Sequence, residues 1–238
     1  MAFVRSRLFD LVLVLWTSFF ACGIPLLWLS GSPETKIRLV TRFWAGGVLL
    51  ALRYTVGIDY VEKGKFPQTS GPHLIVSNHQ SMWETIAFLL IFPDVSVIAK
   101  EELLRIPIFG WYLNNSPMIM IDRQSGAHAL RRMIDQSLKA AAAGRSVLVF
   151  PEGTRLPSTE PVKFRRGVEL LYEKLGLRVL PVAINSGLYW SPFRPCRLPG
   201  TITVSYLDPI EPGLKASEVV AKLEGDIRAE ARLLTGSS

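Results

Sequence analysis

His79 and Glu84 are the pair of residues with the clearest chemical potential in this chain. They stand five positions apart, between one apolar run and the next. Within one ideal α-helix that spacing sets two side chains roughly 140° apart, so they would not meet. If His79 precedes the helix and Glu84 lies in its first turns, the carboxylate can turn back to the imidazole. A carboxylate on one ring nitrogen fixes the tautomer and makes the other nitrogen a better general base.

A second polar cluster, Phe-Pro-Glu-Gly-Thr-Arg, occupies residues 150–155 directly after another apolar run. Gly153 permits a close backbone approach, and Thr154 and Arg155 can bind anionic oxygens. Arg123 ends a third apolar run within Ile-Asp-Arg. Its planar guanidinium could bind a phosphate through two parallel hydrogen bonds. Both clusters therefore suit an anionic group.

Each cluster also has an ordinary structural explanation. His79 could cap a helix while Glu84 is solvated, and residues 150–155 could form a plain strand-to-loop turn. Arg123 could pair with a neighbouring carboxylate at the surface. Lys100, which follows a Val-rich run, has the same two explanations. A fourth run, Leu-Pro-Val-Ala-Ile-Asn, by itself indicates only a buried strand that contains a proline.

The elements that must position these residues follow residue 57, where short apolar runs alternate with helical patterns. Runs rich in Val and Ile predict strands at residues 73–77, 95–99, 118–121, 146–150, 179–184 and 201–206. Apolar residues at helical spacing predict helices at residues 127–143, 164–175 and 216–234. The expected fold is α/β, with a largely parallel mixed sheet flanked by helices. The polar clusters then lie at the carboxyl ends of strands, where such folds place their sites.

The N-terminal part predicts association with a membrane. Residues 11–29 carry no charge over 19 positions, near the roughly 20 residues that cross a bilayer. Residues 36–56 have an amphipathic helical pattern. Basic residues flank the first segment on both sides, so they give no orientation. A span, a helical pair embedded from one face and a cleaved signal peptide all remain open, although no clean small-x-small cleavage site follows.

The composition narrows the class of partner. The 238 residues carry a formal net charge of +7, and 49% of them are hydrophobic. A basic chain suits nucleic acid, an anionic membrane or a phosphorylated substrate. No zinc-finger spacing, RNP-like run or basic repeat favours nucleic acid. The two cysteines, Cys22 and Cys196, give no basis for a disulfide framework in a domain of this size.

Other candidate groups carry less chemistry. His73 opens a predicted strand and His128 lies on a predicted helix, so both are expected to be structural. A zinc site built around His79 lacks a complete ligand set. Ser77 and Ser81 lack the G-x-S-x-G elbow of a serine nucleophile.

The four motifs, in their order, resemble those of the glycerolipid acyltransferase family, and most closely those of the 1-acyl-glycerol-3-phosphate acyltransferases. The motifs are NHQSMWE, IDR, FPEGTR and LPVAIN, and the similarity covers roughly residues 70–190. The first motif of the family is His, four residues, then Asp. Position 84 holds Glu in this chain, which lengthens the carboxylate by one methylene.

The resemblance implies acyl transfer from an acyl-carrier-protein or coenzyme A thioester to the free hydroxyl of 1-acyl-glycerol-3-phosphate. The product would be phosphatidic acid for phospholipid synthesis. His79 and Glu84 would be catalytic. The implied substrate-binding residues are Arg123, Glu152, Gly153, Thr154 and Arg155, and Lys100, after a predicted strand, is a further candidate. No metal and no cofactor beyond the thioester co-substrate is implied.

The change of pattern after residue 57, read with this resemblance, divides the chain into a membrane-associated helical segment, residues 1–57, and an acyltransferase domain, residues 58–238. The expected partners are a lysophospholipid, a thioester donor and a bilayer, with no nucleic acid. The expected location is the cytoplasmic face of an inner or plasma membrane.

Three alternatives stay open. The acceptor could be another lyso-lipid, such as lyso-ornithine lipid or lysophosphatidylethanolamine. The chain could be a catalytically silent membrane protein that binds anionic lipid, although it keeps both His79 and a carboxylate. It could also be a membrane-anchored serine hydrolase.

Overall fold

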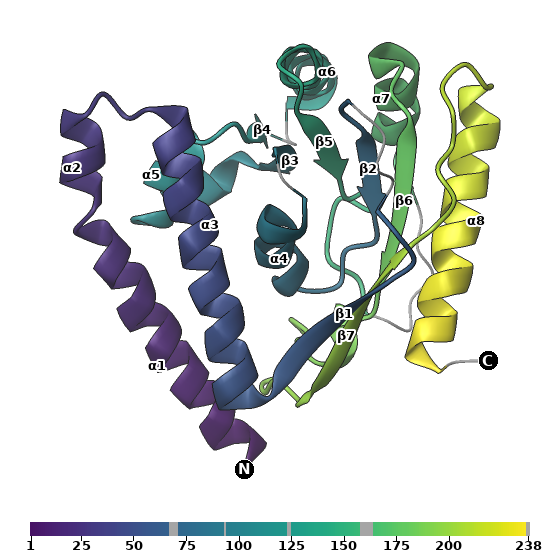
Figure 1. Ribbon diagram of the computed structural model, residues 1–238. Coiled ribbons are helices and arrows are strands. Elements are labelled where there is room, and N and C mark those ends of the chain that lie inside the picture. The colour runs from purple at the N-terminus through teal and green to yellow at the C-terminus, as the bar shows by residue number, and fades with distance from the viewer. Residues whose placement is uncertain (67–70, 93, 123–124, 158–163, 237–238) are drawn as a thin grey trace.

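The fold centres on a mixed β-sheet, seen in a computed structural model that describes residues 1–66, 71–92, 94–122, 125–157 and 164–236. Within these ranges the sheet has seven strands in the order β1-β7-β6-β2-β5-β3-β4. The strands are β1 (Ile58–Lys63), β2 (Leu74–Ser77), β3 (Val95–Lys100), β4 (Ile119–Ile121), β5 (Ser146–Val149), β6 (Val179–Ile184) and β7 (Gly200–Tyr206). Figure 1 shows the twist of this sheet and the helices around it.

Most neighbouring strands are parallel, which confirms the predicted sheet type. The exception is the antiparallel pair β6–β7, and β1 pairs parallel to β7. The six predicted strands appear within one residue at each end. Strand β1 was missed because it lies at the edge and only Ile58 in it is buried, so its polar residues do not produce a strand-like apolar run.

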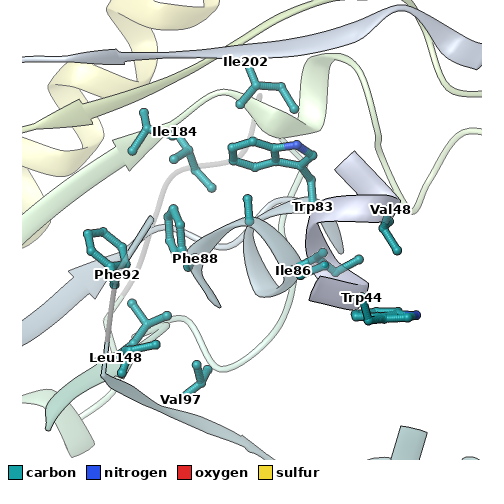
Figure 2. Close-up of a cluster of buried hydrophobic side chains, with 14 of the residues drawn as sticks. Trp44, Val48, Trp83, Ile86, Phe88, Phe92, Val97, Leu148, Ile184 and Ile202 are labelled. Atoms are coloured by element: carbon teal, nitrogen blue, oxygen red, sulfur yellow. The ribbon is translucent and has the colours of Figure 1, made fainter. Parts of the chain in front are cut away.

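Both faces of the central strands are buried, and side chains alternate between two cores. In β5, Leu148 belongs to one core, while Val147 and Val149 belong to the other. This alternation follows from the two-residue period of a strand, and burial of both faces explains why the strand is apolar throughout. Figure 2 shows part of the first core, where Trp83 of α4 lies beside Ile202 of the sheet and Phe92 lies near Leu148.

Helices cover each face of the sheet. They are α4 (Trp83–Ile91), α5 (Phe109–Asn114), α6 (Gly126–Ala142), α7 (Gly167–Leu175) and α8 (Ala216–Thr235), with short 3₁₀ turns η2 (Glu101–Arg105) and η4 (Ser186–Leu188). Figure 1 shows α6, α7 and α8 on one side of the sheet and α4 on the other. Helix α7 begins three residues after its predicted start, because the N–H of Arg165 donates to the carbonyl of Pro151 (3.0 Å) and the N–H of Phe164 donates to Glu224 (3.0 Å).

The N-terminal segment contains α1 (Ala2–Ala21), α2 (Ile24–Leu29), α3 (Glu34–Ala51) and the π-helical turn η1 (Leu52–Val56). Helices α1 and α3 contact each other through two tryptophans. Trp16 Nε1 donates to the carbonyl of Trp44 (3.0 Å), and Trp44 Nε1 donates to Thr17 Oγ1 (3.1 Å). By length and composition the described stretch Ala2–Leu29 could cross a membrane, and an 18-residue window within it has a mean hydropathy of 2.0.

Helix α1 starts well before the uncharged segment predicted at residues 11–29, because its charged first turns dock on the α/β domain. Arg197 pairs with Asp10 at 2.8 Å, and the Arg197 N–H donates to Ser6 Oγ at 2.8 Å. The Arg197 guanidinium also stacks over the rings of Phe9 and Trp190, 4.6 Å from each centroid. These contacts hold the first turns of helix α1 against the α/β domain.

Candidate active site

His79 and Glu84 are in direct contact at the carboxyl end of β2. His79 lies in the loop after the strand, and Glu84 is the second residue of α4. His79 Nδ1 is 2.9 Å from Glu84 Oε1. The expected arrangement is therefore present, and the longer glutamate side chain reaches the imidazole. A carboxylate accepts only, so this contact keeps a proton on Nδ1 and leaves Nε2 with a free electron pair.

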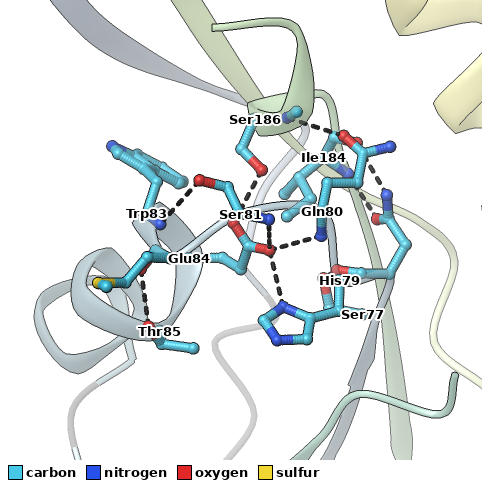
Figure 3. Close-up of polar contacts among 12 residues, drawn as sticks. Ser77, His79, Gln80, Ser81, Trp83, Glu84, Thr85, Ile184 and Ser186 are labelled. Atoms are coloured by element: carbon cyan, nitrogen blue, oxygen red, sulfur yellow. Dashed lines mark hydrogen bonds and ion pairs between the residues drawn. The ribbon is translucent and has the colours of Figure 1, made fainter. Parts of the chain in front are cut away.

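The Glu84 side chain is fully buried, yet its carboxylate is well satisfied. Oε1 also accepts the backbone N–H groups of Gln80 and Ser81, each at 2.7 Å. Oε2 accepts the hydroxyl of Ser186 at 2.8 Å. A buried charge is tolerated only with such partners. Figure 3 shows these bonds converging on one carboxylate, with the second nitrogen of the His79 ring directed away from it.

The loop that carries His79 is joined to the end of β6. Asn78 donates from Nδ2 to the carbonyl of Ile184 (2.9 Å) and accepts the Ile184 N–H on Oδ1 (2.9 Å). Gln80 Oε1 accepts the N–H of Gly187 at 3.1 Å. A Cβ at position 187 would lie 3.0 Å from the Gln80 Cβ, so the close approach favours glycine. These contacts fix the backbone on both sides of His79.

The loop after β5 supports His79 from the other side. The ring of Phe150 stacks on the imidazole, with centroids 4.3 Å apart and an interplanar angle of 19°. Glu152 Oε2 accepts the backbone N–H of His79 at 2.8 Å, and the Leu156 N–H donates to the His79 carbonyl at 2.9 Å. His79 is thus held at its ring, its N–H and its carbonyl, and its side chain stays 16% exposed.

Glu152 is a buried carboxyl group next to this loop. Burial raises its pKa to about 8, the His79 N–H opposes the rise, and the negative charge of Glu84 adds to it. Two neighbouring carboxyl groups therefore differ: Glu84 has four donors, whereas Glu152 holds its proton at neutral pH. Among the sequence-predicted substrate-binding residues, Glu152 is the one whose side chain is buried against His79.

Stability should fall as pH rises from about 5 to about 8, because unfolded Glu152 ionises near 4.5 while the native group stays protonated up to about 8. Glu152→Gln keeps a neutral acceptor for the His79 N–H. We expect the melting temperature of this variant to depend less on pH than that of the wild type. Across that window the change in the free energy of unfolding should be smaller by about a few kcal/mol. Melting temperature in detergent against pH measures it. The control is Glu173→Gln, at an exposed position of α7; equal slopes for the wild type and Glu152→Gln would contradict the assignment.

The remaining residues of the second motif lie in the loop after β5, which contacts the His79 backbone through Leu156. Thr154 and Arg155 are exposed, and Arg155 directly precedes the Leu156 N–H that bonds to the His79 carbonyl. Gly153 has φ of +71°, a backbone conformation that favours glycine. A Cβ there would also lie 2.9 Å from Arg165 Nε. The loop therefore exposes two polar side chains just before the residue that bonds to the His79 backbone.

Two further predicted substrate-binding residues, Lys100 and Arg123, are not part of the loop after β5. Lys100 is exposed at the end of β3, two strands from β2, hence about 10 Å along the same edge of the sheet. Arg123 lies outside the residues that the structure describes. The structure thus brings together His79, Glu84 and the loop 150–156, with Lys100 farther along this edge.

Sequence reasoning missed three residues of this site. Phe150 was taken only as part of its motif, Ser186 follows the fourth motif by one position, and Arg165 lies in an Arg-Arg pair that was assigned to a helix. Arg165 Nε donates to the carbonyl of Glu152 at 3.1 Å. Arg165 could have been suspected from the sequence, because two consecutive arginines follow a loop whose residues suit a phosphate.

A cavity of about 200 Å³ opens beside the site. Its wall is mainly apolar and includes Phe150, Leu130 and Met133, while Gly153 and Arg165 form a polar part. The same Phe150 ring contacts the imidazole, so the cavity adjoins the base. An apolar space with one cation among its described lining residues suits a molecule that has both an apolar chain and an anionic group.

His73 and His128 take no part in this arrangement. His73 is buried just before β2, at the end of the strand opposite His79, and its ring meets Phe66 edge to face at 5.9 Å. Burial lowers its pKa. His128 is exposed on α6. Both positions agree with the structural roles expected from the sequence.

Comparison with known proteins adds independent evidence. The 1-acyl-sn-glycerol-3-phosphate acyltransferase of Pseudomonas aeruginosa is 38% identical over 171 residues, which are 72% of this chain and 66% of the relative. The enzyme of that name from Helicobacter pylori is 35% identical over 139 residues, 55% of each chain. The human beta enzyme is 28% identical over 188 residues, 77% of this chain and 68% of the relative. The matches thus span about half to two thirds of these relatives.

The fold has a close parallel as well. The crystal structure of the 1-acyl-sn-glycerophosphate acyltransferase PlsC from Thermotoga maritima superposes with a TM-score of 0.76 at 24% identity, covering 99% of this chain and 98% of that one. The family model described as Acyltransferase matches residues 56–185, which include His79, Glu84, the loop 150–156 and the end of β6. The chain therefore belongs to the acyltransferase family.

Proposed function

We propose that this protein transfers a fatty acyl group from a thioester to the free hydroxyl of 1-acyl-glycerol-3-phosphate, forming phosphatidic acid. The observation that carries the proposal is the contact of 2.9 Å between His79 Nδ1 and Glu84 Oε1 in a chain of the acyltransferase family. The names of the relatives supply the acceptor, and the acyl donor is either acyl-carrier-protein or coenzyme A.

The proposed reaction needs one base and no protein nucleophile. Nε2 of His79 removes the proton of the acceptor hydroxyl while the hydroxyl oxygen attacks the thioester carbonyl carbon. The buried Glu84 carboxylate stabilises the imidazolium that forms. Collapse of the tetrahedral intermediate breaks the carbon–sulfur bond, and the imidazolium returns the proton to the leaving thiolate. Backbone N–H groups near the motifs are suited to stabilise the transient oxyanion.

The acceptor phosphate is proposed to bind Arg155, Thr154 and the backbone at Gly153, with Lys100 contributing from the end of β3 and Arg123 as a further ligand. An arginine–phosphate contact is charge-assisted and stronger than a neutral hydrogen bond. Arg155 directly precedes the residue that bonds to the His79 carbonyl, so a phosphate there would lie near the base. Glu152 contributes by holding the His79 backbone.

Arg155→Ala is expected to raise the acceptor KM by at least about tenfold, which is about 1.4 kcal/mol, with a much smaller change for the thioester donor. The same result is expected for Arg123→Ala. Lysine at either position should rescue only partly, because an ammonium lacks the planar fork. Steady-state kinetics with each substrate varied in turn measure this, with Lys174→Ala on α7 as the control. A stable Arg155 variant with an unchanged acceptor KM would remove this arginine from the headgroup site.

For the division of the chain, we propose a membrane-associated helical segment, residues 1–57, and an acyltransferase domain, residues 58–238. The first turns of helix α1 contact Arg197 of the α/β domain, and the π-helical turn after α3 leads into β1. Both ends of the segment therefore adjoin the α/β domain. Exposed apolar side chains recur at helical spacing on α1 and on α3 with the turn η1 that follows it: Val4, Leu8, Leu11 and Leu15, then Leu39, Phe43, Leu50 and Tyr54. This arrangement favours a helical pair embedded from one membrane face over a span, and the cytoplasmic face is the proposed location.

Competition among acceptors tests the proposed substrate. Purified protein would receive equal amounts of 1-acyl-glycerol-3-phosphate, lyso-ornithine lipid and lysophosphatidylethanolamine, with acyl-coenzyme A and acyl-carrier-protein offered separately. We expect phosphatidic acid as the main product with at least one donor. If a different acylated lipid were the main product, the proposed acceptor would be wrong, while the proposed role of His79 as the base would stand.

A further inference from the structure

Ser186 contacts the buried carboxylate of the proposed catalytic pair from a distant part of the chain. Its hydroxyl donates to Glu84 Oε2 at 2.8 Å, and both side chains are fully buried. The two residues are 102 positions apart in the sequence. Ser186 lies in η4, immediately after β6, and Figure 3 shows it approaching Glu84 from the side opposite His79.

The two oxygens of Glu84 have different kinds of partner. Oε1 is held by His79, Gln80 and Ser81, which all belong to the loop just before α4. These bonds hold one oxygen relative to its own loop, but rotation about the Cγ–Cδ bond, a torsion with broad preferences, also moves the second oxygen, which none of them holds. The bond from Ser186 to Oε2 fixes that rotation against the sheet.

The position of Ser186 is itself fixed by the backbone around it. The N–H groups of Tyr189 and Trp190 donate to the Ser186 carbonyl at 3.1 and 2.9 Å. On one side the Ile184 backbone bonds twice to Asn78, and on the other the Gly187 N–H bonds to Gln80. The hydroxyl is therefore held by a rigid turn that is joined to the loop of the base on both sides.

We propose that Ser186 is a positioning residue for acyl transfer: it sets the plane of the Glu84 carboxylate so that Oε1 stays aligned with His79 Nδ1. This inference rests on the proposed function, in which His79 is the base. The long side chain at position 84 makes such a tether useful, because glutamate has one more rotatable bond than aspartate. The effect of Ser186 is thus exerted through Glu84, without contact with substrate.

Ser186→Ala should lower kcat by about tenfold to about a hundredfold, as expected for loss of a hydrogen bond to a charged group, with both KM values unchanged. Ser186→Thr retains the hydroxyl and should recover most of kcat. In the Glu84→Gln background, Ser186→Ala should add less than about a twofold loss, because residues that act through each other are not additive. The matched control is Ser96→Ala, a buried serine in β3 whose hydroxyl has no hydrogen-bond partner among the described residues.

A second measurement is independent of activity. In protein labelled with ¹⁵N-histidine, the nitrogen shifts of His79 report which ring nitrogen carries the proton. We expect the Nδ1–H form in the wild type and a larger share of the Nε2–H form in Ser186→Ala, with Ser96→Ala unchanged. An active wild type together with an unchanged kcat, or the same tautomer in a folded Ser186→Ala protein, would overturn the role of Ser186. An inactive wild type with the expected tautomer change would instead contradict the proposed function and leave the positioning contact supported.

Discussion

His79→Ala should reduce acyl transfer by about 10²- to 10⁴-fold, the usual cost of removing a general base. The imidazole is held by Glu84 on one nitrogen and by the stacked Phe150 ring on its face, and alanine removes the nitrogen that accepts the proton. The backbone bonds of residue 79 to Glu152 and Leu156 do not involve the side chain, so folding and membrane association should persist. Initial rates with a thioester and 1-acyl-glycerol-3-phosphate measure the effect.

The matched control for this loss is His128→Ala, because His128 is exposed on α6 and outside the site. It should retain wild-type turnover. Sedimentation with vesicles and a melting curve would show that both variants remain folded and membrane-bound. Near-wild-type turnover by a folded His79→Ala protein would exclude His79 as the base.

Two substitutions of Glu84 distinguish the effect of its charge from the effect of its shape. Glu84→Gln should lose far more activity than Glu84→Asp. The amide is neutral and offers one acceptor oxygen where the carboxylate now accepts bonds from His79, Ser186 and two backbone N–H groups. Breaking such a buried network leaves donors unsatisfied, at about 1–3 kcal/mol for each group. Aspartate keeps the charge and needs only a modest shift to reach the imidazole.

The measurement is kcat for both variants at saturating substrates, alongside melting temperature. Glu173→Gln again serves as the control for a glutamine substitution at an exposed site. If Glu84→Gln is faster than Glu84→Asp, the carboxylate does not support the imidazolium by its charge, and its role is limited to packing.

The sequence predicted those features that depend on local patterns. Strands such as β5 and β6 are apolar on both faces, which shows directly as runs of Val, Leu and Ile. The meeting of His79 and Glu84 was predictable as well, because it needs only a loop followed by the first turn of a helix. The edge strand β1 was not predictable in this way, since its residues are mostly solvated and its pairing with β7 joins distant segments.

Contacts between distant segments account for the rest. Ser186 lies 102 residues from Glu84, and no local pattern links the two. The docking of Arg197 on Asp10 likewise extends α1 into charged residues that a hydropathy argument leaves out. Glu152 was expected in the substrate site by resemblance, whereas its burial against the His79 backbone follows only from the packing of the β5 loop on the β2 loop. Tertiary packing, not local preference, decides these positions.

The balance of products tests the central claim most directly. Purified protein in detergent or vesicles would receive 1-acyl-glycerol-3-phosphate and an acyl thioester, and free thiol, phosphatidic acid and free fatty acid would be measured together. The proposed direct attack predicts one phosphatidic acid for each thiol released, no fatty acid, no acylated protein by intact mass, and loss of both products in His79→Ala. Release of fatty acid without phosphatidic acid, or an acyl group on the protein, would contradict transfer by a histidine base and indicate a hydrolase or a covalent intermediate.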